Sequence, residues 1–289
     1  MFLKEYDKMF KFFIIYLIYR FHIDINIKIK IIRTIIGDMK NKNQSIYYKD
    51  NFYEHLKSFK KLKKVVFSVL LGEYDLISQF NLQKDFDFYL FTDDQSGRYN
   101  HTNWTILPIP EEVKELNVSR VKKQRFIKLH PHLYFKDYDL SIYIDANFKI
   151  IDDLNNFLIR ILSPNYNVYT FEHPERNTIY NETFEVVNLE KEKESIANAI
   201  RERYKKENFP DKNGLIESCL IIRKHNEKDS IYMMNKWYDE IKNYSHRDQL
   251  SFNYILWKTG LKIKYIVKNF ALQYFFQNIT HLELLRIKN

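Results

Sequence analysis

SIYIDANFKI, residues 141–150, is the stretch that decides the fold. An apolar and aromatic run, Ile142 to Ile144, leads directly into the acid Asp145, and the amide Asn147 follows two residues later. A short apolar run of this kind is typical of a buried strand. Side chains at positions i and i+2 of a strand lie on the same face. The stretch therefore predicts a buried strand whose end presents two oxygen donors to one ligand.

Apolar runs and helix-forming segments alternate on both sides of this stretch. Further strands are expected at residues 65–71, 86–94, 104–110, 167–173 and 214–225. Helical stretches are expected at residues 120–130, 153–162, 182–206, 229–244 and 247–258. Strands that alternate with helices predict an α/β, Rossmann-type fold with a mainly parallel central sheet flanked by helices.

Charge divides the 289-residue chain into two parts. Residues 1–64 hold 15 Lys and Arg against 6 Asp and Glu, a difference of +9 that equals the net charge of the whole chain. We expect a basic, aromatic-rich extension at 1–64 and one catalytic domain at 65–289. Because the body is neutral, a nucleic-acid partner is not expected. The extension is suited either to an anionic membrane surface or to covering the main domain.

The location of the protein is expected to be cytoplasmic, at or near the inner face of a membrane. The apolar run 12–19 has eight residues, whereas a membrane span needs about 20. No small-residue cleavage site follows it, so a signal peptide is not expected. A single cysteine, Cys219, is consistent with a reducing compartment.

Polar side chains end three of the predicted strands. Asp93 ends the second strand, Asp145 and Asn147 follow the central one, and His173 ends another. In open α/β sheets, ligands bind beyond the carboxyl ends of the strands. Two oxygen donors there suit Mg²⁺ or Mn²⁺ bridging a diphosphate. Strands also commonly end at turns that contain Asp, so this tripeptide alone leaves both interpretations open.

The segment 120–128 places basic side chains just before the central strand. Ser119 is suited to cap a helix there, on which Arg120, Gln124 and Lys128 share one face. Such a face can neutralise a diphosphate, and it can equally be an ordinary solvated helix face.

Two later segments carry clusters of polar residues. FEHPERN, residues 171–177, places His173 and Arg176 directly after a strand, where they suit sugar hydroxyls or a capped turn. HRDQLSF, residues 246–252, opens a helix with Asp248, which either faces an acceptor hydroxyl as a general base or favours the positive first turn of the helix.

The order of these motifs resembles the TOD/MUCI-type glycosyltransferase-like family, whose members occur in bacterial surface-polysaccharide gene clusters and in plants. The resemblance rests on LGEYDLI, DFYLFTDD, RVKKQRFIKLHPHLYFKDYDLSIYIDANFKI, FEHPERN, GLIESCLIIRKHN and RDQLSFNYILWK, and it covers residues 66–259. It implies a GT-A-like fold, a nucleotide-sugar donor, with a UDP-sugar favoured, and a divalent cation. An amide, Asn147, stands where the usual Asp-x-Asp pattern has its second acid.

The resemblance also implies roles for individual residues. Asp145 and Asn147 are expected to hold the donor diphosphate, directly or through Mn²⁺ or Mg²⁺, while Arg120 and Lys128 balance its charge. Asp93 is a candidate for the ribose or base, and Asp248 for the catalytic group. Residues expected to bind the acceptor are His173, Arg176, Glu217, Arg247 and Gln249.

The function expected from this resemblance is hexosyl transfer to a saccharide or lipid-linked glycan, in capsular or other surface polysaccharide synthesis. The main alternative is a non-catalytic saccharide- or nucleotide-binding module on the same fold. A nucleotidyl-transfer enzyme and a membrane-surface structural protein are two further alternatives.

Overall fold

The computed structural model describes residues 59, 61–72, 77–78, 80 and 83–278. Residues 62–289 form one compact unit, and the fold described below belongs to it. The predicted basic extension lies almost wholly outside the described residues. No helix in the described part of the chain is both long enough and apolar enough to cross a membrane.

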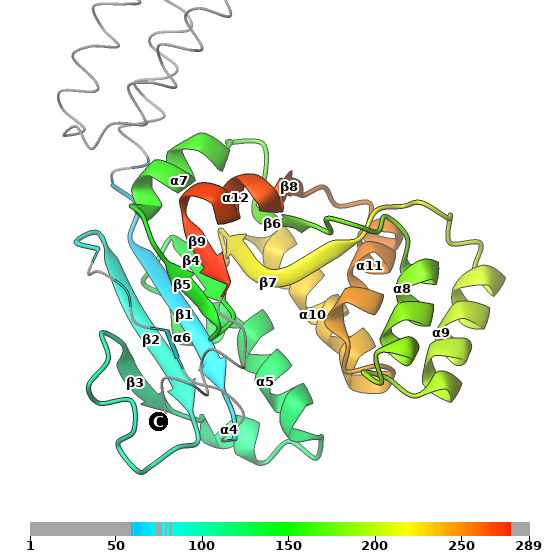
Figure 1. The fold of residues 1–289 in the computed structure, drawn as a ribbon, viewed down its shortest axis with the longest axis horizontal. Coiled ribbons are helices and arrows are strands. Elements are labelled where there is room, and N and C mark those ends of the chain that lie inside the picture. Colours follow the sequence, from blue (N-terminus) through cyan, green and yellow to red (C-terminus); the bar gives the residue numbers. More distant parts are fainter. Residues whose placement is uncertain (1–58, 60, 73–76, 79, 81–82, 279–289) are drawn as a thin grey trace, which may run out of the picture. The chain divides into compact units, whose positions relative to one another are not determined.

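A seven-stranded sheet forms the centre of the unit, with the strand order β3-β2-β1-β4-β7-β6-β8 (Figure 1). The strands are β1 (Lys64–Leu70), β2 (Phe86–Thr92), β3 (Thr105–Pro108), β4 (Leu140–Ile144), β6 (Val168–Glu172), β7 (Ile216–Arg223) and β8 (Lys264–Ile266). In this sheet β7 is antiparallel to both of its neighbours, and all other described pairs are parallel. The prediction of a mainly parallel sheet is confirmed.

A small antiparallel pair lies beside the main sheet and is formed by β5 (Phe148–Ile150) and β9 (Phe276–Asn278). The β5 strand starts directly after the Asp145–Asn147 turn. Segments about 130 residues apart in sequence therefore meet next to this turn, and the sequence pattern did not predict the pairing.

Helices flank the sheet (Figure 1). They are α4 (Glu111–Lys114), α5 (Arg120–Leu129), α6 (Pro131–Tyr134), α7 (Leu154–Ile161), α8 (Ile179–Asn188), α9 (Glu194–Lys206), α10 (Lys228–Asn243), the 3-10 helix η1 (Asp248–Leu250), α11 (Phe252–Thr259) and α12 (Lys268–Tyr274). The helical stretch expected at 182–206 is two helices. Glu190 breaks it in the left-handed region, at φ 54°.

Local sequence signals explain where the site-bearing helices begin and end. Ser119 caps α5, because its hydroxyl accepts a hydrogen bond from the Lys122 amide at 3.4 Å. Gly260 ends α11 in the left-handed conformation at φ 66°, as a glycine at this position commonly does. Both signals were read correctly from the sequence.

The core fills the space between one sheet face and the helices α5 and α10, which pack against each other. Alternate residues of β1, Val65, Phe67 and Val69, point into it, and Trp237 of α10 is fully buried there. The carboxyl ends of the parallel strands and the amino end of β7 consequently meet at one edge of the sheet. The residues of the candidate site lie at this edge.

Candidate functional site

A cavity of about 450 Å³ lies beyond the ends of β2 and β3. It is bounded by α4 and by the first turn of α5, and its walls include Thr92, Asp93, Ile106, Pro108, Arg120 and Lys123. Its walls are mainly apolar, with cationic and carboxylate groups from the strand ends and α5. Apolar walls with a few placed polar groups are typical of small-molecule sites.

Asp93 is fixed at the wall of this cavity. Its Oδ1 accepts a hydrogen bond from the Gly72 amide at 2.7 Å, and its Oδ2 lies 4.0 Å from Arg120 Nε. Gly72 has φ 81°, and a Cβ atom there would lie 2.6 Å from Arg120 Nη1. The positive φ favours glycine here, and a larger residue would make the Arg120 guanidinium shift from its place against the end of β1.

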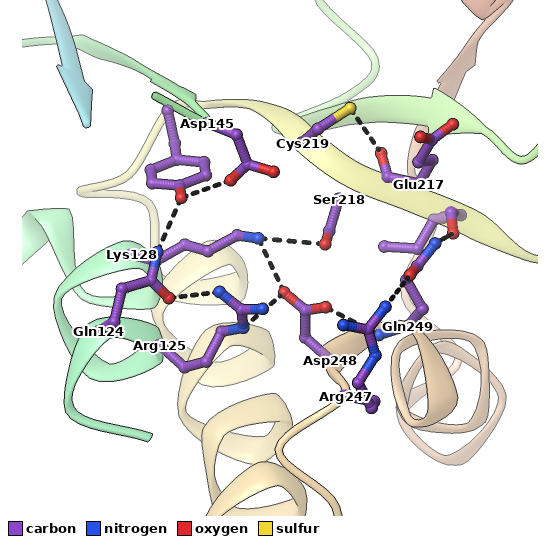
Figure 2. Close-up of polar contacts among 12 residues, drawn as sticks. Gln124, Arg125, Lys128, Asp145, Glu217, Ser218, Cys219, Arg247, Asp248 and Gln249 are labelled. Atoms are coloured by element: carbon purple, nitrogen blue, oxygen red, sulfur yellow. Dashed lines mark hydrogen bonds and ion pairs between the residues drawn. The ribbon is translucent and has the colours of Figure 1, made fainter. Parts of the chain in front are cut away.

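Asp145 lies in the turn directly after β4 and is held by three neighbours (Figure 2). Its amide donates to the Cys219 carbonyl at 2.9 Å, so the pairing of β4 with β7 extends one residue into the turn. The Tyr143 hydroxyl donates to Asp145 Oδ1 at 2.6 Å, and Gln124 Nε2 donates to the Tyr143 hydroxyl at 2.8 Å. This chain of hydrogen bonds ties the orientation of the carboxylate to α5.

The oxygen ligands available at this turn suit a divalent cation whose remaining ligands are phosphate oxygens of the substrate. Tyr143 engages Oδ1, and no hydrogen bond from another described residue is made to Oδ2 of Asp145, while Asn147 stands two residues further on. Among the described residues, no group of three His, Cys, Asp or Glu forms a protein-only metal cage. Mg²⁺ is usually bound through one or two carboxylates plus substrate phosphates, and the residues present match that pattern.

An ionic cluster, formed by Arg125, Lys128, Ser218 and Asp248 and mostly buried, lies next to Asp145 (Figure 2). Lys128 Nζ lies 2.7 Å from Asp248 Oδ2 and donates to Ser218 Oγ at 3.0 Å. Arg125 Nε lies 3.1 Å from the same carboxylate oxygen. Lys128 is 1% exposed and Asp248 is 2% exposed, so both charges are neutralised within the protein.

The cluster holds Asp248 in its ionised form. Burial alone would raise the pKa of this carboxyl, but the charges of Arg125 and Lys128 outweigh burial and keep the pKa well below its usual range. An Asp with so low a proton affinity is a weak general base at neutral pH.

Glu217, at the start of β7, is more accessible than Asp248. It is paired with Lys268 of α12, and its side chain is 27% exposed. Cys219 lies two residues further along the strand and is buried, and burial raises the pKa of its thiol. The Cys219 thiol lies 4.0 Å from the Glu217 carbonyl oxygen.

Arg247 and Gln249 flank Asp248 and hold local structure. Gln249 Nε2 donates to the Ile216 carbonyl at 3.0 Å and Arg247 Nη2 to Gln249 Oε1 at 3.4 Å. The Asp248 carbonyl accepts from the indole of Trp237 at 3.0 Å. These bonds anchor the segment around η1 to β7 and α10.

The loop after β6 satisfies its own polar groups. His173 Nδ1 accepts from the amides of Glu175 and Arg176 at 3.2 and 3.1 Å, and Arg176 Nε donates to Glu182 Oε2 at 2.6 Å. Glu182 is buried in the first turn of α8. The sequence left two alternatives for this segment, a capped turn and a sugar-binding loop. The hydrogen bonds observed are those of a capped turn.

The structure thus gathers the predicted residues in three places along one edge. Asp93 and Arg120 lie at the cavity, Asp145 and Lys128 lie at the end of β4, and Glu217 lies at the start of β7. His173 and Arg176 lie in the loop after β6 at the same edge, where the His173 amide donates to the Leu215 carbonyl at 2.9 Å. The sequence reasoning missed four residues of the site, Arg125, Tyr143, Ser218 and Lys268. Of these, Tyr143 offered a signal, because it stands two residues before Asp145 on the same strand face.

The architecture is the α/β, GT-A-like fold expected from the sequence, with its site at the carboxyl ends of a mainly parallel sheet. Residues 37–283 match the TOD1/MUCI70, glycosyltransferase-like domain, and the chain belongs to this family. The match begins upstream of residue 65, where the catalytic domain was expected to start. A search of curated proteins found no match.

Several solved glycosyltransferase structures are similar to this chain. The bifunctional glycosyltransferase WbbM in its apo form has a TM-score of 0.46 at 11% identity, over 71% of this chain and 39% of that chain. Mouse xyloside xylosyltransferase 1 in its apo form has a TM-score of 0.45 at 8% identity, over 70% of this chain and 85% of that chain. The galactosyltransferase LgtC, in complex with donor and acceptor sugar analogues, has a TM-score of 0.38 at 14% identity, over 65% of this chain and 69% of that chain. The chain thus spans well under half of WbbM.

Proposed function

We propose that the protein transfers a sugar from a nucleotide-sugar donor, with a UDP-sugar favoured, to a saccharide or lipid-linked glycan acceptor. One observation carries the proposal. Helix α5 forms a wall of the cavity at Asp93 with its first turn, and its second turn supports the Asp145 carboxylate through Gln124 and Tyr143. A nucleoside site and a diphosphate site are thereby joined by one rigid element.

The donor would lie along α5. Its nucleoside would occupy the cavity, with the ribose or base near Asp93. The rise from Arg120 to Lys128 on an α-helix is about 12 Å, which leaves room for a diphosphate to extend from the cavity toward Asp145. A divalent cation held by Asp145 and Asn147, when bound, would neutralise that diphosphate.

Cationic side chains would balance the charge of the departing nucleotide. Arg120 and Lys123 line the cavity directly, so they can reach phosphate oxygens. The Lys128 ammonium is enclosed by Ser218 and Asp248, so we assign it an indirect part, supporting the wall behind Asp145. Charge stabilisation at a leaving group is the main contribution that such a site makes to catalysis.

We assign the acceptor side to Glu217. Asp248 is buried and held ionised by two cations, which suits positioning of η1 better than proton transfer. Glu217 is the more exposed carboxylate at the start of β7, and Lys268 orients it. If the reaction inverts the anomeric carbon, Glu217 would take the proton of the acceptor hydroxyl.

The test is turnover of a panel of nucleotide sugars by the full-length protein, with the released nucleotide identified. We expect a nucleoside diphosphate, and Asp145→Ala should reduce its release at least 100-fold because diphosphate stabilisation is lost. Asp239→Ala, which changes an exposed acid of α10, is the matched control and should be unaffected. Pyrophosphate as the product would instead support nucleotidyl transfer.

A binding module is the second candidate function, and Asn147 favours it, because an amide is a weaker ligand than the carboxylate of the usual pattern. If the protein only binds its ligand, it should bind nucleotide but turn over none of the nucleotide sugars in the panel. We also propose a cytoplasmic location and a part in surface polysaccharide synthesis, both from the sequence.

A further inference from the structure

A second charged feature lies at the opposite end of the sheet and takes no part in the proposed reaction. Arg223, the last residue of β7, is fully buried. Its Nε and Nη2 atoms have no hydrogen-bond partner, Nη1 donates to the Met234 sulfur at 3.5 Å, and the guanidinium carbon lies 5.8 Å from the centroid of the Phe67 ring. No carboxylate in the described part of the chain forms an ion pair with it. A buried charge without a counter-charge is strongly unfavourable.

Two serine hydroxyls without partners lie beside this guanidinium. Ser141 of β4 is the direct cross-strand partner of Arg223, so the two side chains lie on the same sheet face. Ser230 lies one helical turn before Met234 on α10, so it shares the helix face that contacts Arg223. Both hydroxyls are buried and neither has a hydrogen-bond partner.

The first turn of α10 adds a further positive element. Ser230 is its third residue, and the N-cap residue Glu227 makes no side-chain hydrogen bond to the helix. The N-terminus of a helix this long favours an anion through its free N–H groups and its dipole. The unpaired guanidinium and the Ser141 hydroxyl thus lie on one sheet face, and the Ser230 hydroxyl lies on the face of α10 that packs against the guanidinium through Met234.

Two carboxylates, Glu227 at the N-cap and Asp229 in the first turn, lie at the start of α10, and neither forms an ion pair with Arg223 among the described residues. Arg223 lowers the pKa of His130, His132 and His225, after the larger effect of burial. The carboxylate that acts on His225 is Asp139, which is already engaged with the Lys63 amide at 2.8 Å. The guanidinium therefore lies among neutral imidazoles and has no carboxylate paired with it in the described part of the chain.

We propose that a small monovalent inorganic anion of halide size binds between Arg223, Ser141, Ser230 and the first turn of α10. It neutralises the guanidinium and satisfies the hydroxyls. The site is about four residues along β4 from Asp145, at the other end of the strand, so the anion supports the fold and does not meet the donor. A water molecule would satisfy the donors but would leave the charge unpaired.

Thermal unfolding at constant ionic strength tests the proposal, with chloride exchanged for gluconate, which is too large for such a site. We expect the Tm of the wild type to rise by on the order of 3 °C when chloride is raised tenfold above half-saturation. Arg223→Met should abolish this dependence. In gluconate alone this variant should be at least as stable as the wild type, since an unpaired buried charge is removed.

Arg203→Met is the matched control, because Arg203 is partly buried but is paired with Glu240. It should lower the Tm and keep the chloride dependence. Equal wild-type Tm values in chloride and gluconate would overturn the proposal and leave water as the occupant.

A structural measurement keeps the proposal testable if Arg223→Met does not fold. Crystals of the wild type grown in bromide should show an anomalous peak between the Arg223 guanidinium and Ser230 Oγ, and Ser230→Ala should weaken it. The absence of such a peak at saturating bromide would contradict the proposal.

Discussion

At the scale of single residues, the most consequential arrangement is the enclosure of Asp248 by two cations. The pair with Lys128 at 2.7 Å is buried, so the Lys128 ammonium has no water as an alternative partner, while Arg125, whose side chain is 17% exposed, lies 3.1 Å from the same carboxylate. Removing the anion would leave the buried Lys128 charge uncompensated. Asp248 is accordingly a stability determinant as well as part of the site.

Asp248→Asn should lower the free energy of unfolding by about 3–5 kcal/mol. The double variant Asp248→Asn, Lys128→Met should recover part of this loss, because it also removes the buried ammonium that has lost its partner. Urea unfolding at neutral pH measures both. The control is Asp239→Asn at an exposed position, which should change the free energy by less than about 0.5 kcal/mol. A fully stable Asp248→Asn variant would contradict the enclosed-charge account.

Glu217 and Asp248 can be separated by kinetics. Glu217→Gln should lower kcat by about 100-fold, with little change in the free energy of unfolding. Lys268→Met should lower kcat by a smaller factor, because Lys268 only orients the carboxylate. A variant Glu217→Gln with unchanged kcat would return the acceptor role to Asp248.

At the scale of elements, α5 connects the cavity with the end of β4, and Gly72 permits this connection. Gly72→Ala should displace Arg120, because the new Cβ would lie 2.6 Å from its Nη1. We expect UDP affinity to fall about tenfold or more, since each 1.4 kcal/mol lost is tenfold in binding. Calorimetric titration measures this change.

Gly260→Ala is the matched control for this prediction. Gly260 has a similar positive φ, 66°, but no atom lies within 4 Å of the Cβ that would be added. Both variants should therefore lose stability through backbone strain, while only Gly72→Ala should lose affinity. Equal UDP affinity in the two variants would show that the position of Arg120 does not matter for the nucleotide.

Six strands of the main sheet, the α5 boundaries and the residues at the strand ends could be predicted from the sequence, because they depend on local signals: apolar runs, the Ser119 cap and the polar residues that end each run. The edge strand β8 has only three residues, too short a run to predict. The antiparallel direction of β7 could not be predicted, because a continuous apolar run does not show whether a strand runs parallel or antiparallel to its neighbours. The pairing of β5 with β9 is also non-local. Within the site, Asp93, Asp145 and Arg120 were found from their places in the chain, whereas Arg125 and Lys268 become partners only through tertiary packing.

At the scale of the whole molecule, stability should depend on pH through buried histidines. Burial lowers the pKa of His130 and His132 to about 4 in the folded protein, against about 6.5 for an unfolded chain. Between these values the unfolded state binds more protons. The free energy of unfolding should therefore fall as the pH decreases from 6.5 to 4, by on the order of 1–3 kcal/mol for each histidine.

Denaturant unfolding across this pH range checks the prediction, with His130→Gln expected to flatten the slope. His101→Gln, at an exposed position, is the control and should leave the slope unchanged. A slope that is the same in all three proteins would show that His130 does not contribute.

The basic segment 1–64 carries a prediction for the full chain. Its excess of +9 should draw the protein to vesicles that contain phosphatidylserine, and added salt should release it, because salt screens charge attraction. Co-sedimentation with phosphatidylserine and with phosphatidylcholine vesicles measures this. Equal binding to both, or binding that salt leaves unchanged, would contradict a charge-driven contact.

The most direct test of the central claim is calorimetric titration of UDP and of uridine, with and without Mn²⁺, into the wild type, Asp93→Ala and Asp145→Ala. If the cavity holds the nucleoside and the end of β4 holds the diphosphate, Asp93→Ala should weaken both ligands. Asp145→Ala should weaken UDP by tenfold or more and leave uridine unchanged. UDP binding that is equally tight in the wild type and in Asp145→Ala, or no binding of any nucleoside diphosphate to the wild type, would contradict the account.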